Sequence, residues 1–129
     1  MKVPADIREA LTALMAEYAM AIDDNRLEDW VELFDEACDY KVMMRENVEQ
    51  NLPNVLMWCD NKNMLRDRIE SYRQVNLYNL HYDRHVLGPL HFTGHDGPLW
   101  RVVSFCPERD TLVPGRICHY MIWCLVPIL

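Results

Sequence analysis

The spacing of hydrophobic residues changes part-way along the chain, and this change limits the folds that the sequence can adopt. In the first part of the chain they recur at steps of three and four, which places them on one helix face: Ile7, Leu11, Leu14, Tyr18 and Ile22. After Asn76 this spacing stops, and short hydrophobic runs alternate with turn residues. Helices followed by strands predict an α+β fold in which N-terminal helices pack on one face of a curved antiparallel sheet.

Local signals predict where the individual elements begin and end. Asp6, with Glu9 three residues later, resembles a capping box for the first helix. The segment Glu46–Asp60 is irregular and predicts a loop with short turns. A second long helix is expected over Met64–Asn76, with the hydrophobic stripe Leu65, Ile69, Tyr72 and Val75 and with Asp60, Asn61 or Asn63 as caps. The other predicted elements are a short helix (Leu27–Asp35), strands (Cys38–Arg45, Tyr82–Phe92, Leu99–Phe105, Ile117–Val126) and a turn (Thr93–Pro98).

Length and charge narrow the class of protein. A chain of 129 residues has the size of one domain, so we take residues 1–129 as a single unit. The formal net charge of −7 argues against nucleic acid and anionic membranes as partners, because both require a basic surface. No hydrophobic run is long enough to span a bilayer. The N-terminal residues lack the apolar core of a signal peptide, so we expect a cytoplasmic protein.

Two residue sets raise the question of a metal site, and neither predicts one. His81, Asp83 and His85 alternate, which would place them on one face of a strand. They combine the two imidazoles and one carboxylate that hold iron in some oxygenases. Spread over roughly 14 Å of strand, however, the two histidines are too far apart to share an ion. The cysteines form no CxxC pair and are expected to be buried apolar residues: Cys38, Cys59, Cys106, Cys118 and Cys124.

An acid–base pair is a second possibility. If the first helix lies across the sheet, Asp23 or Asp24 at its C-terminal end could meet His85. A carboxylate that holds an imidazole in one tautomer makes it a general base. The simpler interpretation, which we favour from the sequence, is that Asp23, Asp24 and Asn25 cap a helix junction.

Basic residues on the second long helix suggest a surface for contact with another protein. Arg66, Arg68 and Arg73, followed by Arg84, stand out in an acidic chain. They either pair within the helix with Asp67 and Glu70 or form a docking face for an acidic partner, and the sequence does not separate the two. Trp123 lies in the strongly apolar run MIWCLV, which would require a partner if the chain itself left it uncovered.

Two long segments carry a resemblance to a known family. AEYAMAIDDNRLEDWVELFDEACDYKV and LMWCDNKNMLRDRIESYRQVNLYNLHYDRHVLG resemble the small (beta) subunits of aromatic-ring-hydroxylating dioxygenases. MLRDRIESYR followed by YDRHVLG is similar to small subunits of the terephthalate dioxygenase and salicylate hydroxylase type. The resemblance covers about residues 7–90. The C-terminal third departs from the family pattern and ends early, which a truncation, an internal deletion or divergence could each explain.

The resemblance carries expectations of its own. It implies a cone-shaped fold of the nuclear-transport-factor-2-like or cystatin-like kind, with C-terminal strands that are shortened here. It implies a trimer of non-catalytic small subunits that supports large (alpha) subunits. It places the Rieske [2Fe–2S] cluster and the mononuclear iron in the large subunit, and no cofactor in this chain.

Three hypotheses for function follow. The leading one is a structural subunit of a Rieske-type hydroxylase that takes part in the breakdown of aromatic compounds, with aromatic carboxylates as the expected class. Its interface residues would be Arg66, Arg68, Arg73, Arg84 and Trp123. The alternatives are a stand-alone lyase or isomerase that uses Asp23 or Asp24 with His85, and a module that binds a small ligand without chemistry.

Overall fold

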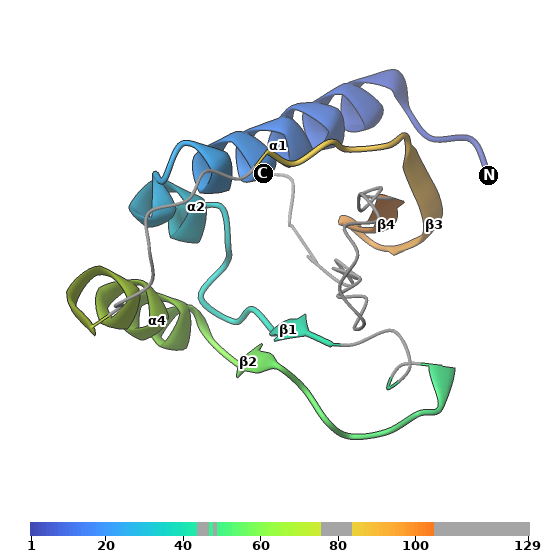
Figure 1. Ribbon diagram of the computed structural model, residues 1–129. Coiled ribbons are helices and arrows are strands. Elements are labelled where there is room, and N and C mark those ends of the chain that lie inside the picture. The colour runs from blue at the N-terminus through green and yellow to red at the C-terminus, as the bar shows by residue number, and fades with distance from the viewer. Residues whose placement is uncertain (44–46, 48, 76–83, 105–129) are drawn as a thin grey trace.

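The chain folds into helices and short antiparallel strands. The protein is described from a computed structural model that defines residues 1–43, 47, 49–75 and 84–104. In Figure 1, α1 runs along one side of the molecule. Helices α2 and α4 lie at the C-terminal end of α1, and the β3–β4 hairpin lies near the N-terminal half of α1. The predicted α+β class, with helices first, is confirmed. The elements are α1 (Ala5–Asp23), α2 (Leu27–Glu32), β1 (Tyr40–Val42), β2 (Met57–Cys59), α4 (Lys62–Val75), β3 (Leu90–Asp96) and β4 (Leu99–Ser104).

Helix α1 starts two residues earlier than a capping box at Asp6 would allow. It begins directly after Pro4, whose carbonyl accepts a hydrogen bond from the Arg8 N–H at 3.1 Å. Asp6 therefore lies inside the first turn, and the predicted capping box is wrong. Its negative charge is still favourable there, because it lies near the positive end of the helix dipole. At the other end Asn25 adopts a positive φ of 58°, and this left-handed residue turns the chain into α2.

The core is an aromatic cluster between α1, α2 and β1. Trp30 lies edge-on to Phe34 and Tyr40, with ring centroids 5.0 and 5.4 Å apart. Tyr18 from α1 closes the cluster against Trp30 at 5.8 Å. Helix α4 contributes Leu65, which is 0% exposed. Burying a leucine side chain in this way contributes about 2 kcal/mol. Because the buried residues come from α1, α2 and α4, their packing fixes the positions of these three helices.

A two-stranded ribbon closes the core from the side opposite α1. Strand β1 pairs antiparallel with β2, with Tyr40 opposite Cys59 and Lys41 opposite Trp58. The sequence predicted a loop over Glu46–Asp60, and β2 corrects its last part. The strand was missed because its two faces are both hydrophobic, so no alternation of polar and apolar residues marks it.

Helix α4 begins and packs differently from the sequence prediction. It starts at Lys62, and Asn61 caps it by accepting a hydrogen bond from the Met64 N–H at 2.9 Å. Of its predicted hydrophobic stripe, Leu65 is buried, but Tyr72 and Val75 are exposed. At this end of α4 the contact with α2 is made by the polar side chain of Arg73, which bonds to Glu28, and not by the predicted stripe.

Strands β3 and β4 form a hairpin of their own. Leu90 pairs with Ser104 and Asp96 with Leu99, with a bulge between Phe92 and Gly94. The predicted turn over Thr93–Pro98 is therefore mostly strand, since the bulge takes up Thr93 and Gly94 and only Gly97–Pro98 turns. In the described residues the strands thus make two two-stranded sheets, β1–β2 and β3–β4.

Of the strand that was predicted over Tyr82–Phe92, Leu90–Phe92 is confirmed as the start of β3, and residues 82–83 lie outside the described residues. Residues 84–89 run without regular structure into β3. Pro89 lacks an N–H, and the His85 N–H bonds to the Asp23 side chain, so neither can donate to a sheet. The predicted strand Ile117–Val126, with Trp123, lies outside the described residues. Within them, no helix is long and apolar enough to cross a membrane.

Candidate functional site

Asp23 and His85 are in contact, as the acid–base interpretation of the sequence required. Asp23 is the last residue of α1, and its side chain is 2% exposed. Its Oδ1 lies 2.5 Å from the His85 Nδ1, and its Oδ2 accepts the His85 backbone N–H at 2.7 Å. One buried carboxylate thus holds both the ring and the backbone of a residue that is 62 positions away. We call this pair the Asp23–His85 clasp.

The charge state of the clasp follows from its surroundings. Burial raises the pKa of the Asp23 carboxyl group. The hydrogen bonds from the His85 ring and backbone, with the charges of His85 and Arg84, outweigh this effect and lower the pKa below its usual value. The carboxylate is therefore ionised at neutral pH and can only accept, so the His85 Nδ1 carries the proton. Such a dyad can orient a general base, and it can equally tie two segments together.

Asp24 takes no part in the clasp. Its side chain is about half exposed and lies 3.9 Å from the Arg26 guanidinium. The interpretation of these residues as a solvated helix junction therefore holds for Asp24 and is wrong for Asp23. The sequence could not separate the two, because adjacent helix residues differ by about 100° in direction and the register of α1 on its neighbours was unknown.

The turn that carries Asp23 is held by Arg73 of α4. The Arg73 guanidinium donates to both carboxylate oxygens of Glu28 at 2.9 Å, and to the side-chain and backbone oxygens of Asn25 at 2.9 and 2.7 Å. The hydrogen bonds from Arg73 lower the pKa of Glu28 to about 2. Arg73 thereby links the end of α4 to the left-handed residue between α1 and α2.

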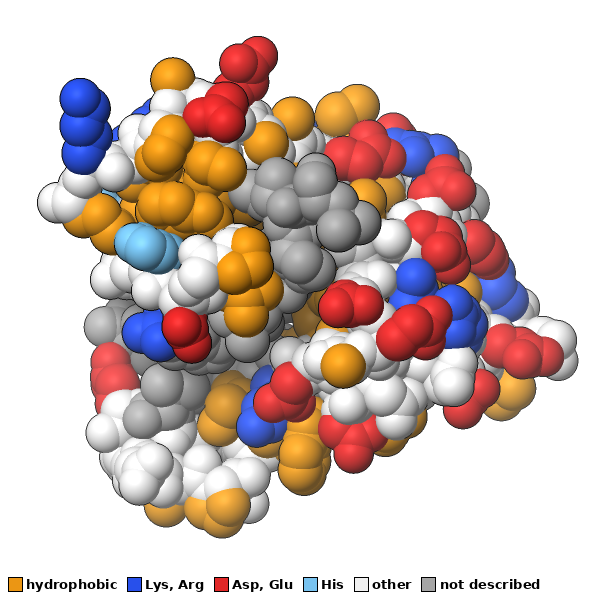
Figure 2. Space-filling view, turned by 180° about the vertical axis from the view of Figure 1, so that it is seen from behind, with side chains coloured by type: hydrophobic (Ala, Val, Ile, Leu, Met, Phe, Trp, Pro, Cys, Tyr) orange, Lys and Arg blue, Asp and Glu red, His pale blue; other side chains and the backbone are white. Residues whose placement is uncertain are grey.

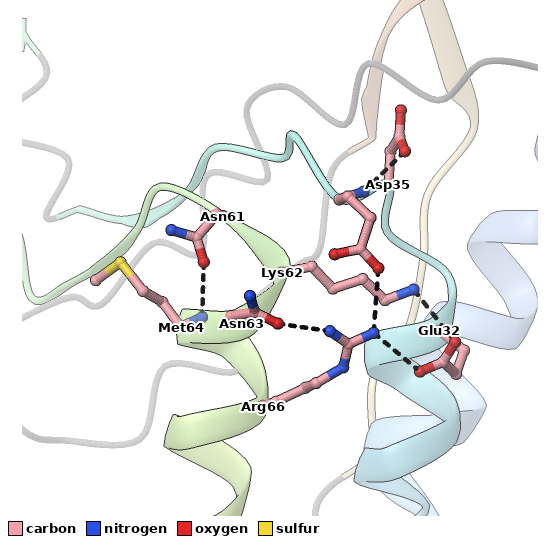
Figure 3. Close-up of polar contacts among 8 residues, drawn as sticks. Glu32, Asp35, Asn61, Lys62, Asn63, Met64 and Arg66 are labelled. Atoms are coloured by element: carbon pink, nitrogen blue, oxygen red, sulfur yellow. Dashed lines mark hydrogen bonds and ion pairs between the residues drawn. The ribbon is translucent and has the colours of Figure 1, made fainter.

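A second charged contact joins the start of α4 to α2 (Figure 3). Lys62 is buried and donates to Glu32 at 3.2 Å. Arg66 reaches from the next turn to Asn63 at 2.7 Å and to Glu36 at 3.2 Å. The sequence analysis overlooked Lys62, because a buried lysine is rare and no local pattern marks it.

The predicted interface arginines therefore differ in what they contact. Arg66 and Arg73 form ion pairs with Glu36 and Glu28, and these ion pairs run between elements. Arg68 is exposed and lies near the Cys59 thiol, and exposed Arg84 lies near Asp23. Trp123 lies outside the described residues.

The described residues offer little to hold a metal ion. They contain no group of three or more His, Cys, Asp or Glu side chains arranged for one. Of the alternating set only His85 is described, since His81 and Asp83 fall within residues 76–83. Cys38 and Cys59 are free thiols, and burial raises the pKa of both.

The fold has a relative among solved structures. The match is the beta subunit of a protein described as an aromatic-ring-hydroxylating dioxygenase, from Novosphingobium aromaticivorans DSM 12444. It shares 36% sequence identity and a TM-score of 0.67 over 84% of this chain and 69% of the relative. The chain belongs to the beta (small) subunits of aromatic-ring-hydroxylating dioxygenases. The resemblance seen in the sequence is thus confirmed.

Curated relatives of this beta-subunit family agree. The chain is 40% identical over 77 residues to the anthranilate 1,2-dioxygenase small subunit of Burkholderia cepacia, covering 60% of this chain and 48% of that one. It is 36% identical over 78 residues to the subunit beta 1 of the terephthalate 1,2-dioxygenase terminal oxygenase component of Comamonas sp, covering 60% and 51%. The chain therefore spans about half the length of these relatives. No family model matches it.

A second solved structure supports the fold alone. The beta subunit of the benzoate 1,2-dioxygenase of Burkholderia mallei matches with a TM-score of 0.58 over 86% of this chain and 73% of its own length. Its sequence identity is 13%, so the likeness concerns the backbone.

Proposed function

We propose that this chain is a structural, non-catalytic small subunit of a Rieske-type, non-haem iron hydroxylase of aromatic rings. The observation that carries the proposal is the 36% identity to a dioxygenase beta subunit over 84% of the chain. The polar contacts of the candidate site support it, because they link α1, α2, α4 and the segment before β3 to one another. Side chains that link elements in this way stabilise the fold.

The names of the relatives suggest the class of substrate. Anthranilate and terephthalate, named for two relatives, are both aromatic rings that carry a carboxylate. We therefore propose that the assembled enzyme hydroxylates an aromatic carboxylate in the breakdown of aromatic compounds in the cytoplasm. In this proposal the substrate is bound by the large subunit.

The proposed partner is a large (alpha) subunit that holds both metal centres. One relative is named as subunit beta of a terminal oxygenase component, a name that supports a companion chain. The proposal assigns the Rieske [2Fe–2S] cluster and the mononuclear iron to that companion. This chain would have a cone-shaped fold and would form the trimer that supports the large subunits. The lack of a three-ligand group in the described residues is compatible with this division.

Capture on co-expression tests the proposal. This chain, carrying an affinity tag, is produced together with the Rieske-type large subunit encoded nearest to it, and iron is measured in the eluate. We expect the large subunit to be retained together with its iron, while the chain produced alone yields no iron. Recovery of this chain alone in both cases would contradict the proposal.

The Asp23–His85 clasp favours one alternative, a lyase or isomerase with an imidazole base. In that case the isolated chain would exchange C–H protons of carbonyl compounds with solvent deuterium, and His85→Gln would abolish the exchange while the fold persists. The structural role predicts no exchange above the rate in buffer. It also predicts that His85→Gln lowers the stability of the chain.

A further inference from the structure

An exposed tryptophan stands on the outer face of the β1–β2 ribbon. Alternation along the strands turns Tyr40 and Cys59 toward the core and Lys41 and Trp58 away from it. Trp58 is 49% exposed, and Leu56, two residues earlier on the same face, is 53% exposed. We call Asp39, Lys41, Leu56 and Trp58 the Trp58 face.

The indole of Trp58 is held in one orientation although it is exposed. Its Nε1–H donates to the Asp39 Oδ1 at 2.6 Å, and the Lys41 ammonium lies 4.8 Å from the ring centroid. Lys41 and Asp39 also pair with each other at 3.4 Å. An aromatic side chain that is ordered before binding loses little conformational entropy when a partner covers it, so such residues make strong anchors at interfaces.

The charges around this face indicate what kind of surface it fits. Asp39, which bonds to the indole, and Asp60, which directly follows β2, are both exposed carboxylates, and Lys41 pairs with Asp39. The whole chain carries a net charge of −7. A second copy that met this face with its own would bring carboxylates together, whereas an arginine-bearing surface would pair with them and stack on aromatic rings.

We propose that the Trp58 face is the docking surface for the large subunit. The complementary surface would offer an apolar recess for the indole of Trp58 and at least one arginine or lysine beside Asp39 and Asp60. This inference rests on the proposed function, because it requires that a large subunit exists. It moves the expected contact from the arginines of α4, two of which bond within the chain, to the ribbon.

Affinity measurements on the co-expressed complex test the inference. We expect Trp58→Ala to weaken binding of the large subunit by about tenfold or more, because truncating an interface anchor has effects of this size. Trp58→Phe, which keeps the ring and loses the bond to Asp39, should weaken binding by less. Asp39→Asn should weaken binding several-fold and reduce its dependence on salt. Met20→Ala is the control, since Met20 on α1 is 50% exposed and lies outside the face.

The outcomes separate the inference from the function on which it rests. Binding by Trp58→Ala within twofold of the unmodified chain, with both folded by circular dichroism, would overturn the inference and leave the proposed function intact. Loss of self-association with unchanged binding of the large subunit would also overturn it, and would assign the face to a second copy. Failure of the unmodified chain to bind at all would overturn the proposed function itself.

Discussion

The two ends of the molecule are held together in different ways. Every buried residue that the structure describes lies at or before Leu65, in α1, α2, β2, α4 and the segments between them. The β3–β4 hairpin has half-buried and exposed residues only. Figure 2 shows the same contrast on the surface, with acidic and basic side chains interspersed over the α2–α4 end and hydrophobic ones gathered at the other end.

This contrast gives the Asp23–His85 clasp its importance. Two contacts tie the hairpin region to the helical end: the clasp, and the Arg8 guanidinium 4.8 Å from the Phe92 ring centroid. The helical end has a buried core, whereas at the hairpin end specific contacts such as these take its place. We therefore expect substitutions at the two ends to differ in size and in how far their effects spread.

A matched pair of leucine truncations should produce the largest difference. Leu65→Ala removes a fully buried side chain and should lower the free energy of unfolding by about 3 kcal/mol, the usual range for such sites being roughly 2–5. Leu90→Ala in β3 removes a half-buried one and should cost about 1 kcal/mol. Urea denaturation of both variants measures this, and equal losses would contradict the contrast.

Breaking the clasp should come next in size. Asp23→Asn removes the charge from two hydrogen bonds of a buried group, which should cost about 2 kcal/mol. Hydrogen exchange should then show faster opening of residues 84–104, with little change in α4. Asp24→Asn is the control and should change stability by less than about 0.5 kcal/mol, because its side chain is exposed. Uniform loss of protection along the chain would argue against a local tie.

The same carboxylate predicts a dependence of stability on pH. The pKa of Asp23 is lowered in the folded chain, so the unfolded chain binds this proton more readily. Its contribution to the free energy of unfolding is complete above the unfolded pKa of about 4, and it is lost as the pH falls through the folded pKa. Denaturation between pH 7 and pH 3 should show a steeper fall for the unmodified chain than for Asp23→Asn. Parallel curves would show that Asp23 does not contribute.

The smallest expected effect is at Arg73. Arg73→Lys keeps the charge but loses the planar fork that bonds Glu28 and Asn25 together, and should lower stability by less than about 1 kcal/mol. Arg68→Lys, on the same helix, should be close to neutral. Thermal melts of the two variants at low and high salt make the comparison, and a larger loss for Arg68→Lys would contradict it.

The sequence predicted the helical end better than the hairpin end, for a physical reason. Helix α1 and the buried Leu65 follow from a local spacing of hydrophobic residues that the core then satisfies. The exposure of Tyr72 and Val75 depends on what the rest of the chain places beside the end of α4, which no local pattern records. Strand β2 has only three residues and two hydrophobic faces, so alternation could not reveal it.

The candidate site shows the same division. The sequence named Asp23 and His85 as a pair, but it could not choose between Asp23 and Asp24 or between a contact and a helix cap. The choice depends on the rotation of α1 and on a contact across 62 residues. Lys62 and its partner Glu32 were missed because a buried lysine is rare and is recognised only once its carboxylate is in place.

The mass of the co-expressed assembly tests the central claim most directly. This chain and the proposed Rieske-type large subunit are co-expressed and analysed by size-exclusion chromatography with light scattering. The claim predicts a single species that contains both chains in equal numbers and all of the iron, with a mass that fits three copies of each. Elution of this chain as a monomer, apart from an iron-bearing large subunit that assembles without it, would contradict the claim.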